Sequence, residues 1–520
     1  MSESYVVSID AGTGSCRCAL FDQHGNQASF SSREWSHPTI SRYPGSQVFD
    51  TDQNWKLICA SIKEALGKAH IKSPEIAAIS ASSMREGMVL YNNEGREIWA
   101  CPNVDARARK EAAEMMKEGL GEKIYFVGGD WLSIISPPRF RWIKRHKAKV
   151  YNEMAHMTML SDWITYKLTN MFTTNPSIGS SSGMFDLSER CWSNEIIETC
   201  GLPEDIFPPV YESGTVIGEV TKKAAQETGL KEGTSVVIGG ADTQLGLVGI
   251  GAINPLDMAT IGGSFWQQTA ITDKPVIDPG IRLRTLCHIV PNQWMIEGIG
   301  FYSGLAMRWF RDAFCDLEKK QAAERGIDPY CIMEQEAQKV PPGSNGVFAI
   351  FSNIMNAKRW IQASPMFIQF DLTSPKESGR KECIRAIQES AAYVAFGHLK
   401  IIEAMLNHSP KEIAFAGGAA KGFMWPQILC DVLGVRVRVP IIKESTSLGA
   451  AICASIALGK YKNMSDAVKQ IVKYEQIYSP KIENHKMYIQ SYEKWKEIYT
   501  LALRIVEKKL ARPMWSPPGF

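Results

Sequence analysis

The chain of 520 residues is too long for one hydrophobic core and predicts about two to four domains. With 45% hydrophobic and 22% charged residues and a net charge of +3, its composition is that of a soluble globular protein and gives no reason to expect nucleic acid as a partner. No stretch approaches the roughly 18 unbroken apolar residues of a membrane helix, and residues 1–4 lack a signal-peptide pattern. The 12 cysteines are scattered without a CxxC pair, which favours reduced thiols in the cytoplasm and argues against a His/Cys metal site.

The chain opens with an apolar strand, a turn rich in glycine and hydroxyl groups, and a second apolar strand. Asp10 ends the first strand, and the turn consists of Gly12, Thr13, Gly14 and Ser15. Backbone N–H groups and hydroxyls in such a turn can hold phosphate, and Asp10 can hold magnesium through water. Arg17 could reach the same anion. An ordinary hairpin with a polar turn explains these residues equally well.

Residues 27–30 predict a third strand and therefore an antiparallel meander. A helix capped by Asp50 or Thr51 follows, and then a buried strand over 76–82. Arg85 and Glu86 come directly after that strand. A cation beside a carboxylate at a strand end suits recognition of hydroxyl or carbonyl groups, although a surface ion pair is an equal alternative.

The next polar residues, Asn103, Asp105 and Arg107, recur with period two. They predict an extended segment with three polar side chains on one face. Alternatively, Asp105 is the cap of a helix over 106–116, which leaves Asn103 and Arg107 unexplained.

Three local predictions follow for the next hundred residues. The basic stretch 139–149 predicts a helix whose cations, including Arg139, are solvated. Ser161 or Asp162 is expected to cap another helix. Residues 179–183 are expected to form a flexible loop of small residues.

A buried strand over 236–238 runs into two glycines and a lone acid, Asp242, at the start of a helix. A carboxylate in that place can orient a hydroxyl and accept its proton, as phosphoryl transfer requires. An aspartate that only caps the helix is the alternative.

Residues 258–266 repeat the opening design of strand, glycine-rich turn and strand, with Thr260, Gly262 and Gly263 in the second copy. Two such turns half a chain apart predict an internal duplication, with two similar domains facing phosphate across a cleft.

A third glycine pair, Gly417 and Gly418, joins a strand to a helix that also carries Lys421. There a flat ring could approach the backbone, although close packing alone often explains such a pair. A long apolar helix is expected over 389–406, a small-residue helix from residue 444, and a polar helical tail after residue 475.

Taken together, these motifs resemble the FGGY family of carbohydrate kinases, within the actin/hexokinase/heat-shock ATPase superfamily, over about residues 5–475. The resemblance implies an α/β fold of two duplicated ribonuclease-H-like domains around an ATP cleft. It divides the chain into an N-terminal domain (1–246), a C-terminal domain (247–475) and a helical tail (476–520).

The resemblance also assigns roles. It implies that Asp242 is the catalytic base and that Asp10 and Asp242 hold Mg²⁺. The ATP-binding residues would be Gly12, Thr13, Gly14, Ser15, Arg17, Thr260, Gly262, Gly263, Gly417, Gly418 and Lys421. The substrate-binding residues would be Arg85, Glu86, Asn103, Asp105, Arg107, Asp162 and Gln244. Relatives often have a third glycine where Ala419 stands, which departs from the family pattern.

Residues 82–87, 99–107 and 307–315 further resemble family members that phosphorylate a quorum-sensing signal, linear dihydroxypentanedione. We therefore expect a small-molecule substrate, ATP and Mg²⁺ as cofactors, no nucleic-acid or membrane partner, and, from some relatives, regulation by a carrier protein of the sugar phosphotransferase system. Another sugar or polyol kinase of the family is the first alternative. A non-kinase ATPase or sugar sensor of the superfamily is the second. A P-loop enzyme is the third, and the absence of any GxxxxGK[ST] argues against it.

Overall fold

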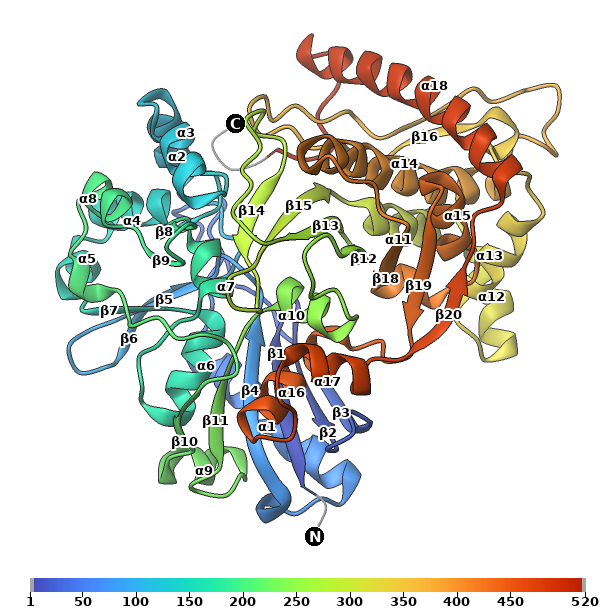
Figure 1. The fold of residues 1–520 in the computed structure, drawn as a ribbon. Helices are drawn as coiled ribbons and strands as arrows, with labels where there is room; N and C mark the ends of the chain where they lie inside the picture. Colours follow the sequence, from blue (N-terminus) through green and yellow to red (C-terminus); the bar gives the residue numbers. More distant parts are fainter. Residues whose placement is uncertain (1–3, 517–520) are drawn as a thin grey trace.

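The computed structural model describes residues 4–516 and consists of two lobes, each built on one mixed β-sheet (Figure 1). The first sheet has the order β10-β11-β4-β1-β2-β3 and the second the order β14-β15-β13-β12-β18-β19-β20. The strands of the first sheet are β1 (Tyr5–Ala11), β2 (Ser15–Phe21), β3 (Gln27–Glu34), β4 (Ile76–Ser83), β10 (Val216–Glu219) and β11 (Ser235–Ala241). Those of the second are β12 (Met258–Gly262), β13 (Trp266–Thr272), β14 (Arg284–Cys287), β15 (Trp294–Gly300), β18 (Glu412–Ala416), β19 (Arg436–Pro440) and β20 (Tyr474–Tyr478).

The two sheets share one strand order, which confirms the predicted duplication. In the first, an antiparallel meander β1-β2-β3 continues into β4 and β11, each parallel to its neighbour, and β10 closes the edge antiparallel. In the second, the meander β12-β13-β15 continues into parallel β18 and β19, and β20 closes the edge antiparallel. β14 is an additional strand on the outer side of β15.

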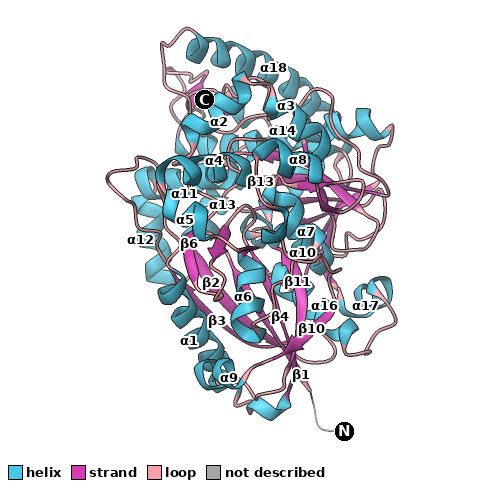
Figure 2. Cartoon of the chain, turned by 90° about the vertical axis from the view of Figure 1, so that its left-hand side faces the viewer, coloured by secondary structure: helices cyan, strands magenta, loops and turns pink. Residues whose placement is uncertain are grey.

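The helices cover the faces of both sheets (Figure 2). Their bounds are α1 (Thr51–Ala69), α2 (Arg109–Lys117), α3 (Leu120–Gly128), α4 (Ser136–His146), α5 (Ala148–Glu153), α6 (Leu160–Thr169), α7 (Pro176–Gly179), α8 (Asn194–Cys200), α9 (Lys222–Thr228), α10 (Asp242–Gly249), α11 (Ser303–Phe314), α12 (Asp316–Arg325), α13 (Pro329–Gln338), α14 (Arg380–Leu406), α15 (Met424–Leu433), α16 (Ser445–Ala457), α17 (Met464–Ile471) and α18 (Ile482–Glu507). Among residues 4–516, three small sheets complete the lobes. Their strands are β5 (Met88–Tyr91), β6 (Glu97–Cys101) and β7 (His156–Met159); β8 (Phe185–Asp186) and β9 (Cys191–Trp192); and β16 (Phe348–Ile350) and β17 (Met366–Ile368).

Both faces of β1 are buried, as expected for a central strand with an almost continuous apolar sequence. Because side chains alternate along a strand, Val7 and Ile9 pack toward α1 and α6, whereas Val6 joins a different core with α10 and α16. Asp50 caps α1 by accepting a hydrogen bond from the Gln53 N–H, as predicted.

Helix α10 lies between the two sheets. Its residues Leu245 and Val248 pack with the first sheet, and Leu247 and the C-cap residue Ile250 pack with strands of the second. The predicted domain boundary after residue 246 therefore falls within this helix, and α16 and α17 from the second half of the chain return to the first sheet.

Helix α14 covers the other face of the second sheet and begins at Arg380, nine residues before the predicted start at Glu389. Helix α18 packs on α15 and places Tyr488, Trp495 and Tyr499 in the same core. The polar tail predicted after residue 475 is therefore part of the second lobe, since β20 extends the sheet and α18 completes its core.

Two predictions for residues 160–183 were wrong. Helix α6 begins at Leu160 with Met159 as its N-cap and no side-chain cap, because the Asp162 carboxylate instead accepts a hydrogen bond from the Thr174 hydroxyl at 2.7 Å. Residues 179–183 are not a flexible loop. The serines there are buried, and their hydroxyls bond to backbone groups around them.

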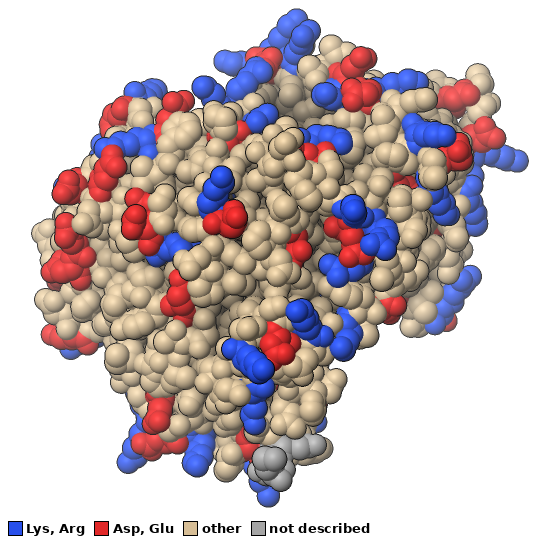
Figure 3. All heavy atoms as spheres, viewed as in Figure 1, with Lys and Arg blue, Asp and Glu red and all other residues tan. Residues whose placement is uncertain are grey.

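None of the helices in residues 4–516 combines the length and apolar composition that crossing a bilayer would require. On the face shown in Figure 3, acidic and basic side chains are interspersed.

Candidate active site

Asp242 is the first residue of α10, directly after β11, where the chain passes between the two sheets. The N-cap is Ala241, so the alternative in which Asp242 serves only as a cap is wrong. Burial raises the pKa of Asp242 to about 6, the Arg85 guanidinium lowers it, and the negative charge of Asp10 raises it. A carboxylate with this pKa is ionised at neutral pH and able to accept a proton.

Asp10 lies at the end of β1, which is parallel to β4 and shares the first sheet with β11. It is buried, its Oδ1 has no hydrogen-bond partner among residues 4–516, and burial raises the pKa of its carboxyl group. The guanidinium of Arg17 lies between two carboxylates, with its Nη1 3.7 Å from Asp10 Oδ2 and 3.6 Å from Glu444 Oε2. Three residues predicted to act together, Asp10, Arg17 and Asp242, are thus brought together.

These carboxylates fit a magnesium ion that takes most of its ligands from elsewhere. Within residues 4–516 no group of three or more His, Cys, Asp or Glu side chains is arranged to hold a metal. Asp10 and Asp242 supply two carboxylates, one with an unpartnered oxygen, and Mg²⁺ characteristically completes its shell with water and substrate phosphate.

The side-chain rings of Trp35 and His37 contact backbone carbonyls of the first glycine-rich turn. Trp35 Nε1 donates to the Gly12 carbonyl at 3.0 Å, and His37 Nε2 contacts the Thr13 carbonyl at 2.8 Å. Thr13 and Gly14 are exposed, and Asn103 Nδ2 donates to Thr13 Oγ1 at 3.0 Å. Asn103, predicted to bind substrate, therefore contacts the predicted phosphate turn.

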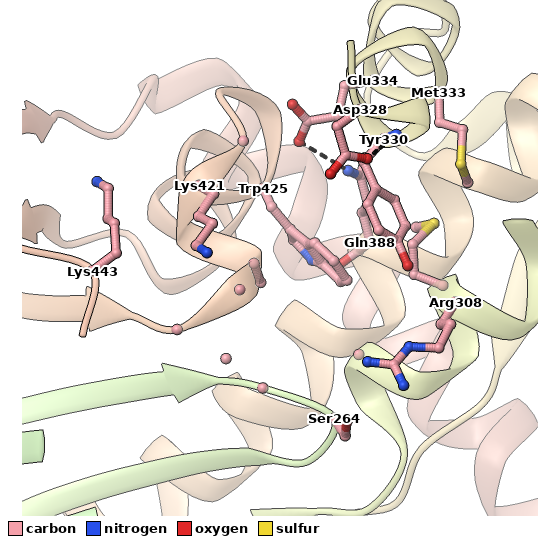
Figure 4. A pocket seen from close by; sticks show the side chains of 18 of the residues that line it. Ser264, Arg308, Asp328, Tyr330, Met333, Glu334, Gln388, Lys421, Trp425 and Lys443 are labelled. Atoms are coloured by element: carbon pink, nitrogen blue, oxygen red, sulfur yellow. Dashed lines mark hydrogen bonds between the residues drawn. The ribbon is translucent and has the colours of Figure 1, made fainter. Parts of the chain in front are cut away.

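A cavity of about 630 Å³ opens between the second turn and the third glycine pair. It gathers six of the predicted ATP-binding residues: Arg17, Gly262, Gly263, Gly417, Gly418 and Lys421. In Figure 4 Lys421 and Arg308 approach it from opposite sides, and Trp425 and Tyr330 supply aromatic walls. A cavity with cationic groups, flat apolar walls and exposed glycine backbone suits a nucleoside phosphate.

The backbones of the two glycine turns touch. Gly417 has φ of +91°, and a Cβ there would lie 2.7 Å from the Gly262 carbonyl oxygen, so only glycine fits. Thr260 does not face the cavity: it is buried, and its hydroxyl donates to Gln268 Oε1 at 2.6 Å.

Arg85 and Glu86 are both buried and pair with residues of the second lobe. The Arg85 guanidinium binds Glu297 through two hydrogen bonds, of 2.7 and 3.0 Å, whereas its Nε is 3.9 Å from Glu86 Oε1. Glu86 Oε1 accepts from Arg284 Nη2 at 2.7 Å, and the same nitrogen binds Asp130. The surface ion pair considered as an alternative is therefore wrong.

Residues 102–108 form turns instead of the predicted extended segment, and α2 begins only at Arg109. Asp105 Oδ1 accepts from Arg107 Nε at 2.7 Å, and the Arg107 guanidinium lies over the rings of Trp99 and Trp142. The shared polar face is absent because Asp105 and Arg107 bind each other inside the protein.

Arg139, predicted to be solvated, is buried in α4. It donates hydrogen bonds to the backbone carbonyls of Glu86, Pro102, Asn103 and Asp105. This guanidinium supports the turns on which the predicted substrate residues lie.

Asp162 and Gln244 are also buried. The Asp162 carboxylate accepts a hydrogen bond from Thr174, in the segment that follows α6, and burial raises the pKa of Asp162 to about 7. Gln244 follows Asp242 on α10 and donates to the Ser177 and Cys287 carbonyls, and its Oε1 has no partner in the described part of the chain. The structure therefore places Gln244 beside the catalytic candidate and gives Asp162 a structural partner.

Comparison with models of known protein families shows which family the chain belongs to. The N-terminal domain of the FGGY family of carbohydrate kinases matches residues 5–249, and the C-terminal domain of that family matches residues 265–458. The chain belongs to the FGGY family of carbohydrate kinases. Its members are ATP-dependent phosphotransferases with an alcohol acceptor.

Two relatives of this FGGY chain match its whole length. It is 42% identical over 522 residues to a protein named Autoinducer-2 kinase from Escherichia coli K12, covering 100% of this chain and 98% of the relative. An Autoinducer-2 kinase from Yersinia enterocolitica gives the same identity and coverage. Xylulose kinase from Lactobacillus acidophilus shares the fold, with a TM-score of 0.85 at 20% identity over 98% of this chain and 100% of that one.

Several residues of the FGGY site escaped sequence reasoning. Glu297, Arg284 and Asp130 surround the Arg85–Glu86 pair, and Glu444 contacts Arg17. The cavity walls from α11, α13 and α14 were missed as well. Of these residues, only Glu297 and Arg284 could have been suspected from the sequence, because each is a charged residue within an otherwise mostly apolar strand.

Proposed function

We propose that this FGGY kinase transfers the γ-phosphoryl group of ATP to the terminal hydroxyl of linear dihydroxypentanedione, the signal autoinducer-2. The observation that carries the proposal is 42% identity along the full chain to relatives named Autoinducer-2 kinase. Arg85, Glu86 and Asp242 together supply the hydroxyl- and carbonyl-binding groups and the base that such an acceptor needs.

Asp242 acts on the acceptor. Its carboxylate accepts the proton of the terminal hydroxyl while the hydroxyl oxygen forms a bond to the γ-phosphorus and the bond from that phosphorus to the β–γ bridging oxygen breaks. ADP leaves with the bridging oxygen. Most of the rate comes from positioning and charge stabilisation, because phosphoryl transfer needs little covalent assistance.

The nucleotide occupies the cavity between the lobes, with its adenine against Gly417 and Gly418 and its phosphates toward Gly263 and the Thr13 turn. Arg17 connects this cavity to Asp10. Asp10 and Asp242 would hold the magnesium ion that accompanies ATP, which neutralises phosphate charge when bound.

Arg85 and Glu86 bind the carbonyl and hydroxyl groups of the acceptor. Both side chains are held by charges of the second lobe, so their positions depend on the lobes being together. Closure of the lobes would also exclude water, which otherwise competes as the nucleophile.

The first experiment compares ATP consumption by the purified protein with dihydroxypentanedione, xylulose, glycerol and no acceptor. We expect turnover with the dione to exceed the other rates by at least about tenfold. A preference for xylulose or glycerol would retain the kinase mechanism and refute the substrate. Equal rates with and without acceptor would favour an ATPase. Regulation by a phosphotransferase-system carrier protein stays a prediction, which a binding assay with that carrier would test.

A further inference from the structure

The acceptor-binding pair of the first lobe is completed by charges of the second. Arg85 and Glu86 follow β4, whereas their partners Glu297 and Arg284 lie on β15 and β14 (Figure 1). Those two strands pair directly, with Arg284 opposite Glu297 in the register. A cation and an anion side by side on one sheet therefore face an anion and a cation at the end of the other.

The Glu297 carboxylate accepts hydrogen bonds from both terminal nitrogens of the Arg85 guanidinium. Nη1 of Arg85 lies 2.7 Å from Glu297 Oε2 and Nη2 lies 3.0 Å from Oε1, and both side chains are buried. This is the bidentate geometry in which a guanidinium binds a carboxylate most strongly and with defined orientation. It is also the geometry through which an unpaired arginine would bind a carboxylate on a substrate.

Carboxylates outnumber guanidinium groups around Asp242. Arg85 and Arg284 are paired with Glu297, Glu86 and Asp130, and the charges of Arg85, Glu86 and Asp10 act on Asp242. Arg139, also buried nearby, donates to backbone carbonyls. An acceptor carrying a negative charge would meet an excess of carboxylates and would have to displace Glu297 to reach Arg85, at the cost of leaving a buried charge unpaired.

We propose, building on the function proposed above, that Glu297 determines the charge class of the acceptor. Because Glu297 occupies both terminal nitrogens of the Arg85 guanidinium, the site accepts neutral hydroxy-carbonyl compounds and rejects sugar acids. Glu297 is a specificity residue that acts through Arg85 and takes no part in the proton transfer.

The test uses Glu297→Gln with gluconate as the anionic probe. The substitution keeps the size of the side chain and removes its charge, so Arg85 gains an unpaired charge that a carboxylate can satisfy. We expect gluconate to inhibit Glu297→Gln competitively against the neutral acceptor, with an inhibition constant at least about tenfold below that of the wild-type protein, and KM for the neutral acceptor to rise. A purely structural defect would raise KM without producing inhibition by gluconate.

Glu389→Gln is the matched control. Glu389 forms a buried pair with Arg385 on α14, in the same lobe, with Nε 2.9 Å from Oε1. Its loss tests the general effect of breaking a buried ion pair, and gluconate inhibition should stay at the wild-type level. Glu297→Asp keeps the charge and should continue to reject gluconate.

The proposal is overturned if wild-type protein binds or phosphorylates gluconate as well as neutral acceptors, or if Glu297→Gln rejects gluconate as the wild type does. If Glu297→Gln fails to fold, gluconate binding by the wild-type protein and by Glu297→Asp decides whether the proposal stands. The neutral acceptor in these assays is whichever of dihydroxypentanedione, xylulose and glycerol shows turnover. The exclusion of anionic acceptors is therefore tested even if dihydroxypentanedione is not the substrate.

Discussion

The hydroxyl of Thr446 donates a hydrogen bond to the backbone carbonyl of Asp242 at 3.1 Å, joining residues 204 positions apart. The donor belongs to α16 and the acceptor to the first turn of α10. The two helices approach backbone to backbone at Gly249 and Gly449, where a Cβ would lie 2.0 Å from the opposing carbonyl oxygen. The small-residue helix predicted from residue 444 thus fixes the helix that carries the catalytic candidate.

Replacing Thr446 by valine removes this hydrogen bond and keeps the shape of the side chain. We expect kcat to fall about threefold to tenfold, in line with a net hydrogen-bond contribution of about 1 kcal/mol. Thr446→Ser should retain most of the activity. Thr500→Val is the control, because Thr500 makes the same kind of bond to the Lys496 carbonyl on α18. Equal losses in both valine variants would contradict a specific role.

Asp242→Asn should affect turnover far more than nucleotide binding. Removal of a general base typically costs about 10²–10⁴-fold in rate. The nucleotide cavity is lined by other residues, so the Kd for ADP, measured by calorimetry without magnesium, should stay within about threefold. A variant that keeps full activity would show that Asp242 is not the base.

The pH profile should report the raised pKa of Asp242, which burial brings to about 6. Only the ionised carboxylate accepts a proton, so kcat/KM for the acceptor should be constant above pH 7 and fall as the pH drops through 6. Burial also raises the pKa of Asp130, which pairs with Arg284 in the neighbouring charge cluster. Nucleotide affinity measured across the same range separates this effect from titration of ATP, and a profile that is flat down to pH 5 would refute the assignment.

Asp162→Asn distinguishes a substrate residue from a structural one. Burial raises the pKa of Asp162 from 3.8 to about 7, so the folded protein loses stability as the pH rises through that interval and the carboxylate ionises. The amide cannot ionise. At pH 8 the variant should therefore have the higher free energy of unfolding, by on the order of 4 kcal/mol, and the higher melting temperature, and at pH 4 the two proteins should be alike.

Activity completes the Asp162 test. If Asp162 has only its structural partner Thr174, kcat/KM should stay within about threefold of the wild-type value. Asp371→Asn is the control for stability, because Asp371 is exposed and its hydrogen bonds to Thr373 lower its pKa. A large loss of acceptor affinity in Asp162→Asn would restore its predicted role in substrate binding.

The sequence allowed the prediction of those parts of the site that lie within one strand and its turn. Asp10 with the Gly12–Ser15 turn, Asp242 and the Gly417–Gly418 pair all have local patterns, and repetition of the first pattern predicted two similar sheets. The pairing of Arg85 with Glu297 could not be predicted in this way, because the two residues are 212 positions apart and no local sequence pattern links them. For the same reason Arg139 was assigned to solvent: charge alone does not show that backbone carbonyls from four turn residues converge on it.

Gly417→Ala should weaken ATP binding. The positive φ of +91° disfavours a side chain, and the added Cβ would press against the Gly262 carbonyl and separate the two glycine turns that border the cavity. We expect KM for ATP to rise at least about tenfold. Gly326→Ala is the control, because Gly326 also has a positive φ but its Cβ would meet open space. An increase of the same size in both variants would point to general destabilisation.

The return of α16 to the first sheet has a consequence for biosynthesis. The strands of the first lobe are all made before residue 242, but the helix that covers their second face is Ser445–Ala457. A nascent chain that has completed its first sheet therefore exposes the apolar side chains of Val6, Phe21 and Val237 until most of the second lobe has been translated. Such an intermediate is a natural substrate for chaperones, and premature termination anywhere before α16 would leave both lobes open to proteolysis.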